Sequence, residues 1–414
     1  MEREIAINIL MDYETKKTYL NIALANGLPD TMTQAGKNLV TRLVYGTVQY
    51  RLRLDYELRP WIKGKRVRTF ERMVLLMSVY EHLYLDMPDY AIVDEAVKLT
   101  KKNRGRRSAT FVNAVLRHCF NNPQDLDGLD EDMRLSIEES IPLWIVKMFT
   151  HQYGQEATKK ICHSFNEIPL KSARVNTLHL TREQFLEKYK GFEKGHLSGD
   201  AVILKKGTLT NHPAFINGDM IIQDESAQKV AQLLNPSGAD EVVDMCSAPG
   251  GKTTHLAALM NNKGHIDACD IYVHKGKLIL ENCDRLGVTN VSVIIGDSTD
   301  LSIFNGKQYD KVLLDGPCTG LGVLGRKPEI RYHDSEIMDK IIPIQQKLLD
   351  NAYSLCKNKG NIVYSTCTLN KKENETQIAS LIKRHKDLHI VQERTIFPYE
   401  YHSDGFYMCL LEKD

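Results

Sequence analysis

The chain has 414 residues, which is too long for one ordinary hydrophobic core and predicts two or three domains. Its 54 lysines and arginines nearly balance 53 acids, so the net charge of +1 excludes a protein that is cationic throughout, although a local basic surface remains possible. No apolar stretch reaches the roughly 18 residues of a membrane span, and nine scattered cysteines argue against a disulfide scaffold. We expect a cytoplasmic protein with reduced thiols that does not contact a membrane.

Residues 1 to about 120 are predicted to be helical, because apolar residues recur three or four positions apart. The first expected face holds Leu39, Leu43, Tyr50 and Leu54, the second holds Met73, Met77, Tyr80 and Tyr84, and the third, after a break at Pro88, holds Ile92, Ala96 and Leu99. Charge is uneven along the chain: this region carries +7 and the remaining residues carry −6.

The basic residues of this region form two clusters in the sequence. The first consists of Arg51, Arg53, Arg59, Lys63, Lys65, Arg66 and Arg68, and the second of Lys101, Lys102, Arg104, Arg106 and Arg107. Each cluster is either a solvated loop or part of a surface that contacts a phosphate backbone, and charge alone does not decide between them.

Between residues 121 and 140 the chain is acidic and polar, which indicates a linker into a short helix. Residues 141–222 are typical of a small α+β module. Strands are expected at Ala173–Leu178 and Ala201–Leu204, and Thr181 with Gln184 forms a capping box for a helix that runs through Lys188.

From about residue 240, short apolar runs alternate with helical segments, which predicts βαβ crossovers and a doubly wound, mainly parallel sheet. The predicted strands are Val242–Met245, His265–Cys269, Val291–Ile295, Lys311–Leu314 and Asn361–Tyr364, with an antiparallel pair at Asp387–Gln392 and Phe406–Leu411.

A glycine-containing turn follows the first of these strands. Gly250 and Gly251 allow a sharp turn that brings the backbone close to a ligand, where a doubly wound sheet binds nucleotide-like cofactors. Taken alone, such a turn is more often structural. However, Asp270, Asp297 and Asp315 follow successive strands, and three acids at one sheet edge suit a cationic adenosine cofactor, S-adenosylmethionine.

Two cysteines follow the next strands, at Asp315-Gly-Pro-Cys318 and Ser365-Thr-Cys367. A single cysteine is usually a small buried hydrophobe, but neighbouring strand ends would bring these two thiols to one rim. A disulfide is improbable in a reducing compartment, and no ligand spacing indicates zinc or another metal. A thiolate beside S-adenosylmethionine suits methylation of a pyrimidine at C5, because addition at C6 makes C5 nucleophilic.

At these motifs the chain resembles the RNA cytosine-5 methyltransferases, the family of bacterial Sun/Fmu and eukaryotic NOL/NSUN proteins. Residues 223–414 carry the motifs of its Rossmann-like methyltransferase domain, namely Gln223-Asp-Glu-Ser-Ala-Gln228, Cys246-Ser-Ala-Pro-Gly-Gly-Lys252, Asp297, Asp315-Gly-Pro-Cys318 and Ser365-Thr-Cys367. Residues 1–130 resemble the all-helical NusB-like RNA-binding domain, and residues 141–222 resemble a small RRM-like segment. The domain order is that of the RsmB-type enzymes, which act on 16S rRNA.

The resemblance implies a role for each site residue. Cys367 would be the nucleophile, Cys318 would assist product release, and Asp315 would lie at the edge of the base. The implied cofactor contacts are Cys246, Ser247, Ala248, Pro249, Gly250, Gly251, Lys252, Asp270, Asp297 and Asp315. The implied target is cytosine 967, in free 16S rRNA or an early small-subunit particle, and the implied enzyme is a monomer. Methylation of another RNA such as tRNA, or a non-catalytic RNA-binding role in assembly or antitermination, remain alternatives.

Overall fold

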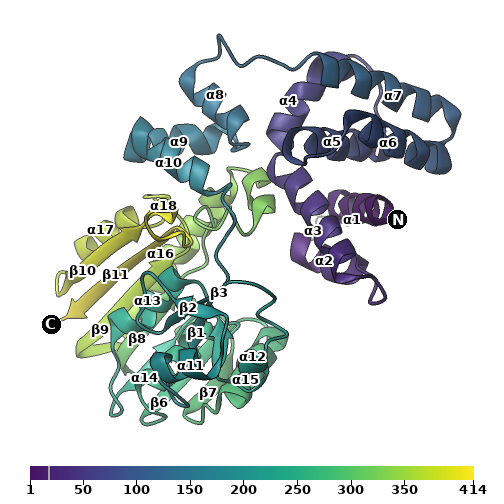
Figure 1. Cartoon of the computed structure of the whole chain (residues 1–414). Coiled ribbons are helices and arrows are strands. Elements are labelled where there is room, and N and C mark those ends of the chain that lie inside the picture. Colours follow the sequence, from purple (N-terminus) through teal and green to yellow (C-terminus); the bar gives the residue numbers. More distant parts are fainter. Residues whose placement is uncertain (17–18) are drawn as a thin grey trace. The chain divides into compact units, whose positions relative to one another are not determined.

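The computed structural model describes residues 1–16 and 19–414 of the chain (Figure 1). The chain divides into two compact units. The helical unit comprises residues 1–166 and 327–333, and the sheet unit comprises residues 167–326 and 334–414. Within the described residues, no helix has both the length and the apolar character needed to cross a membrane.

The helical unit is all-α in its described part, as predicted for the N-terminal region. Its helices are α1 (Glu2–Lys16), α2 (Leu20–Gly27), α3 (Gln34–Gln49), α4 (Arg51–Ile62), α5 (Thr69–Tyr84), α6 (Asp89–Arg104), α7 (Arg106–Asn121), α8 (Glu131–Glu138), α9 (Leu143–Tyr153), α10 (Gln155–Ser164) and the short 3-10 helix η2 (Pro328–Tyr332). Helix α6 begins directly after Pro88, where the sequence predicts a break.

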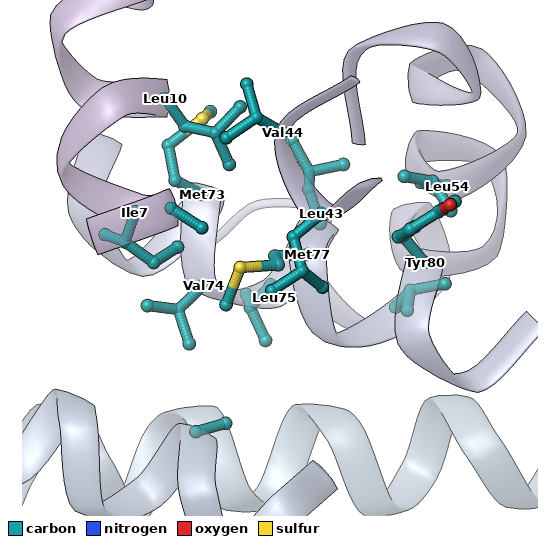
Figure 2. Packing of buried hydrophobic residues seen from close by; sticks show 14 of the residues in the cluster. Ile7, Leu10, Leu43, Val44, Leu54, Met73, Val74, Leu75, Met77 and Tyr80 are labelled. Carbon is teal, nitrogen blue, oxygen red and sulfur yellow. The ribbon is translucent and has the colours of Figure 1, made fainter. Parts of the chain in front are cut away.

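The core of the helical unit surrounds α5, which is buried along most of its length. Met73 and Met77 lie one turn apart on this helix and pack in one buried cluster with Ile7 of α1 and Leu43 of α3 (Figure 2). The spacing of apolar residues therefore identified the buried face of α5 correctly.

The helix face predicted from Leu39 to Leu54 is wrong as a single face, because α3 and α4 are separate helices that meet at Tyr50. The carbonyl oxygens at the end of α3 accept hydrogen bonds from Arg331 and Tyr332 of η2. A helix leaves its last carbonyl groups without internal partners, and here a segment distant in sequence supplies those partners.

The sheet unit begins with a small antiparallel sheet. Its strands are β1 (Ser172–Val175), β2 (Phe192–Lys194), β3 (Ala201–Leu204) and β4 (Met220–Ile222), in the order β2-β3-β1-β4, with helices α11 (Arg182–Lys188) and α12 (Pro213–Ile216). The capping box of Thr181 and Gln184 is present, and both predicted strands form, although the first ends at Val175.

A seven-stranded mixed sheet dominates the sheet unit, in the order β10-β11-β9-β8-β5-β6-β7. The strands are β5 (Glu241–Asp244), β6 (His265–Asp270), β7 (Val291–Ile295), β8 (Tyr309–Asp315), β9 (Cys356–Thr366), β10 (Leu388–Ile396) and β11 (Phe406–Lys413). Strands β5 to β9 pair in parallel, and β11 pairs antiparallel with both β9 and β10. Every strand predicted for this region forms, including the closing antiparallel pair.

Helices cover both faces of this sheet, as expected for a doubly wound fold. Successive strand residues point to opposite faces: Val242 packs in a cluster with Leu256 of α14, whereas Val243 packs with Leu349 of α16. The helices are α13 (Glu225–Leu234), α14 (Gly251–Leu259), α15 (Val273–Leu286), α16 (Ile337–Leu355), α17 (Glu375–Arg384) and α18 (Pro398–Tyr401), with the 3-10 helix η1 (Leu301–Phe304). Because the parallel strands all point the same way, the loops after β5, β6, β7, β8 and β9 gather at one edge.

Candidate active site

A cavity of about 740 Å³ lies at the carboxyl ends of the parallel strands. The three acids that follow successive strands, Asp270, Asp297 and Asp315, all line it. Ile271 and Tyr272 also line it and remain about half exposed, at 50% and 52%. Carboxylates beside uncovered apolar side chains fit S-adenosylmethionine, since ribose hydroxyls and a sulfonium need acceptors and an adenine ring needs apolar contact.

The predicted cofactor loop connects β5 to α14. The backbone N–H of Ser247 donates to the carbonyl oxygen of Cys269, at 2.8 Å, which fixes the loop beside β6. Gly250 has a φ of +98°, and a Cβ atom there would lie 3.3 Å from Cα of Ile279, so this turn favours glycine on two grounds. Of residues 246–252, Cys246 and Ala248 line the cavity.

The two motif cysteines lie together at the ends of β8 and β9. Their Sγ atoms are 3.4 Å apart, and both cysteines are free and half-buried. Its hydrogen bond to the sulfur of Cys367, together with burial, raises the pKa of the Cys318 thiol well above its usual value. Cys318 therefore keeps its proton and can donate it to the sulfur of Cys367.

The remaining seven cysteines comprise one in the cofactor loop and six that are buried. Cys246 lies in the cofactor loop, where burial raises the pKa of its thiol well above the usual value. The other six are buried, as expected for side chains that only pack: Cys119, Cys162, Cys269, Cys283, Cys356 and Cys409.

Asp315 is held at the end of β8 by two side chains. Its Oδ1 accepts a hydrogen bond from Oγ of Ser365 at 2.7 Å, and its Oδ2 lies 2.6 Å from Nζ of Lys252. Burial disfavours the Lys252 ammonium, but the Asp315 carboxylate outweighs this effect and raises the pKa of Lys252. Lys252 thus points at Asp315 and stacks over Phe406, whose ring centre is 5.4 Å away.

Sequence reasoning missed three side chains that surround the thiols. Glu373 and Asn374, in the turn after β9, and Gln345 of α16 are all buried and hydrogen-bond to residues next to the cysteines. Their only local signal is an acid and an amide placed a few residues after the Thr-Cys motif.

Comparison with protein families gives three matches along the chain. Residues 1–121 match the NusB family, residues 141–209 match the ferredoxin-like domain of RsmF/B-like methyltransferases, and residues 231–412 match 16S rRNA methyltransferase RsmB/F. The middle module is therefore ferredoxin-like, which is close to the RRM-like segment that we expected.

Whole-length relatives agree with this domain order. A probable ribosomal RNA small subunit methyltransferase B of Bacillus subtilis is 36% identical over 99% of this chain and 98% of its own length. One of Synechocystis is 32% identical over 99% of both chains. The crystal structure of PH0851 shares the fold, with a TM-score of 0.84 at 24% identity over 100% of this chain and 99% of its own. The chain belongs to the RsmB/F family of S-adenosylmethionine-dependent RNA methyltransferases.

Proposed function

We propose that this enzyme methylates C5 of a cytosine in small-subunit ribosomal RNA, and that the base is cytosine 967 of 16S rRNA. The observation that carries the proposal is the pair of thiols, 3.4 Å apart, beside an acid-lined cavity in a chain of this family. A second thiol would be superfluous for methylation of a nucleophilic atom, but it has a use when the enzyme must first add to the base and then leave.

In the proposed reaction Cys367 is the nucleophile. Its thiolate forms a bond to C6 of cytosine, and the electron pair of the C5–C6 double bond moves to C5. Bound S-adenosylmethionine would supply the methyl group to C5, with its sulfonium leaving as a neutral thioether. A water molecule then accepts the C5 proton, the double bond reforms, and the C6–S bond breaks with its electron pair returning to Cys367.

Cys318 assists the last step. Its sulfur lies 3.4 Å from that of Cys367, and a hydrogen bond from its S–H group to the departing thiolate stabilises the charge that develops there. Asp315 accepts from the exocyclic amino group of the cytosine, and its contacts with Lys252 and Ser365 hold it in place for this role.

We further propose that Asp270 and Asp297 hold the ribose and amine groups of the cofactor, and that residues 246–252 form its backbone contacts. The position of both acids on the cavity wall supports this assignment. The sequence assigns Asp315 to both the cofactor and the target base. We favour contact with the base, because the ion pair with Lys252 holds the Asp315 carboxylate.

The RNA partner is supported by a basic surface on the helical unit. Arg104 lies 5.0 Å over the ring of Phe70, and Lys65 lies 5.8 Å over the ring of Phe111, so the two sequence clusters meet in space. We define the basic surface as the exposed residues Lys63, Lys65, Arg66, Arg68, Lys101, Arg104, Arg106 and Arg107. Among described residues none of these eight forms an ion pair with an acid, which leaves their charges available to phosphates. We propose that a monomer acts on free 16S rRNA or an early small-subunit particle.

Bisulfite sequencing of rRNA from a deletion strain tests the target. Cytosine 967 should lose its methyl group in the deletion strain and regain it when the gene is restored. Full methylation in the deletion strain would refute the rRNA assignment, and loss of methylation in a tRNA would redirect it. Absence of S-adenosylmethionine binding in calorimetry would instead favour a non-catalytic RNA-binding protein.

Substitution of each cysteine tests the adduct. Cys367→Ala should abolish turnover, because no sulfur then reaches C6. Cys318→Ala should trap a covalent complex with the RNA that survives a denaturing gel, because attack proceeds while release fails. An adduct formed by Cys367→Ala instead would reverse the two roles.

A further inference from the structure

Two consecutive side chains in the turn between β9 and α17 bond to residues that flank the thiols. Glu373 and Asn374 are both fully buried, at 0% exposure. Neither takes part in the chemistry proposed above. The short hydrogen bonds of Glu373 go to the loop of Cys318 and those of Asn374 to the loop of Cys367, and Glu373 accepts a longer one, at 3.5 Å, from the hydroxyl of Thr368.

Glu373 holds the loop of Cys318. Its Oε2 accepts the backbone N–H of Thr319 at 2.9 Å, and its Oε1 accepts the Thr319 hydroxyl at 2.6 Å. On the other side of the cysteine, Nε2 of Gln345 donates to the carbonyl oxygen of Pro317 at 2.8 Å and reaches Oε2 of Glu373 at 3.2 Å. Cys318 is thus fixed through the residues on both of its sides.

Asn374 holds the loop of Cys367 in the same manner. Its Oδ1 accepts the hydroxyl of Thr366 at 2.6 Å, and its Nδ2 donates to the carbonyl oxygen of Thr368 at 2.9 Å. These are the residues directly before and after Cys367. The two loops meet where the hydroxyls of Thr319 and Thr368 lie 2.9 Å apart.

We propose that Glu373 and Asn374 are positioning residues that divide the reaction between them, Glu373 aligning Cys318 for release and Asn374 aligning Cys367 for attack. The inference rests on the proposed two-thiol mechanism. Misplacing a reacting group by about 1 Å can cost about 100-fold in rate, so each contact set matters at a different step.

The carboxylate of Glu373 is suited to its task because it only accepts hydrogen bonds. Besides Thr319 and Gln345, Nδ2 of Asn370 donates to it at 3.1 Å. An amide in its place would turn an N–H group toward one of these donors. The hydrogen bond that Cys318 makes to the sulfur of Cys367 and burial raise the pKa of Cys318 most, and the nearby charge of Glu373 adds to them. Together they keep Cys318 in the S–H form that release requires.

Single-turnover assays with 16S rRNA and labelled S-adenosylmethionine test this division. Glu373→Gln should transfer the methyl group at near the wild-type rate in the first turnover, accumulate the RNA adduct on a denaturing gel, and lose about 100-fold in steady-state turnover. Asn374→Ala should lose about 100-fold in the first turnover itself and accumulate no adduct. Lys372→Gln, an exposed neighbour in the same turn, should behave as wild type.

Calorimetry of cofactor binding shows whether each variant is folded. Where Glu373→Gln or Asn374→Ala is not, Thr319→Val and Thr366→Val remove a single hydroxyl donor to the same side chains and should show the same division in weaker form. Equal defects at one step in both variants, or wild-type kinetics in both, would overturn the inference. Cys318→Ala runs alongside: failure to trap an adduct there refutes the two-thiol mechanism, whereas an adduct there but not in Glu373→Gln refutes only the role of Glu373.

Discussion

Acids at the ends of neighbouring strands have different surroundings. Asp244, at the end of β5, is fully buried, and burial raises its pKa to about 7 although Thr253 donates a hydrogen bond to it at 2.7 Å. Asp315, at the end of β8, has Lys252 as an ion-pair partner. The buried acid is therefore partly neutral near pH 7.

The raised pKa of Asp244 predicts that the sheet unit loses stability as pH rises. A carboxyl with a higher pKa in the folded than in the unfolded state stabilises the fold at low pH, and that contribution disappears as pH rises through about 7. From pH 5 to pH 8 the loss should be about 3 kcal/mol. Amide hydrogen exchange of β5 and β8, corrected for intrinsic rates, measures it. Asp244→Asn should flatten this pH dependence; equal slopes in both proteins would mean that Asp244 is ionised in the folded state.

At the residue scale the sequence predicted the residues to which we assign the reaction, and it missed the side chains that support them. Short motifs that indicate a chemical role contain Cys318, Cys367 and Asp315, and the strand order brings these residues to one edge of the sheet. Gln345 and Glu373 reach the same site from elements with no motif, since hydrogen-bond partners across a fold leave no spacing in the sequence.

At the element scale, the strands were predictable because short apolar runs bounded by turns are typical of strands in a sheet that is buried on both faces. The break between α3 and α4 could not be predicted, because Tyr50 is neither proline nor glycine and no local signal marks the break. The hydrogen-bond donors to the last carbonyl groups of α3 lie in η2, about 280 positions later in the chain, after the sheet unit has begun.

Arg331 of η2 should be essential to the stability of the helical unit. Its guanidinium is fully buried and donates to the carbonyl oxygens of Gln49, Glu139, Ser140 and Phe165 and to Oδ1 of Asn166. Arg331→Leu would leave the buried carbonyl oxygens of Ser140 and Phe165 without their donor and weaken the bonding of the other three acceptors, so the free energy of unfolding should fall by about 3 kcal/mol.

Tryptophan fluorescence reports on this unit alone, since both tryptophans, Trp61 and Trp144, belong to it. Arg134→Ala, which removes an exposed ion pair with Glu138, serves as the control and should change little. An equally small effect of Arg331→Leu would show that water replaces its hydrogen bonds.

At the scale of the whole molecule, a net charge of +1 conceals two regions of opposite sign. Residues 1–120 carry +7, and the basic surface concentrates part of that charge on the α4–α5 loop and the α6–α7 junction. The remaining −6 includes the acids of the cavity. The sequence revealed both clusters, but not that they adjoin, because their contact depends on the packing of Phe70 and Phe111.

The basic surface should therefore account for much of the salt dependence of RNA binding. Each phosphate contact contributes about 0.7 to 0.9 to the slope of log affinity against log salt concentration. The triple variant Arg66→Ala, Arg106→Ala and Arg107→Ala should lower that slope by about 2 and weaken binding at low salt, with cofactor binding unchanged.

The control variant Lys98→Ala with Lys160→Ala removes lysines of the same unit that are already paired with acids, and it should alter the slope less. Filter binding to a 16S rRNA fragment between 50 and 200 mM salt measures both. If the triple variant keeps the wild-type slope, RNA contacts the enzyme elsewhere, and the basic surface is only solvated.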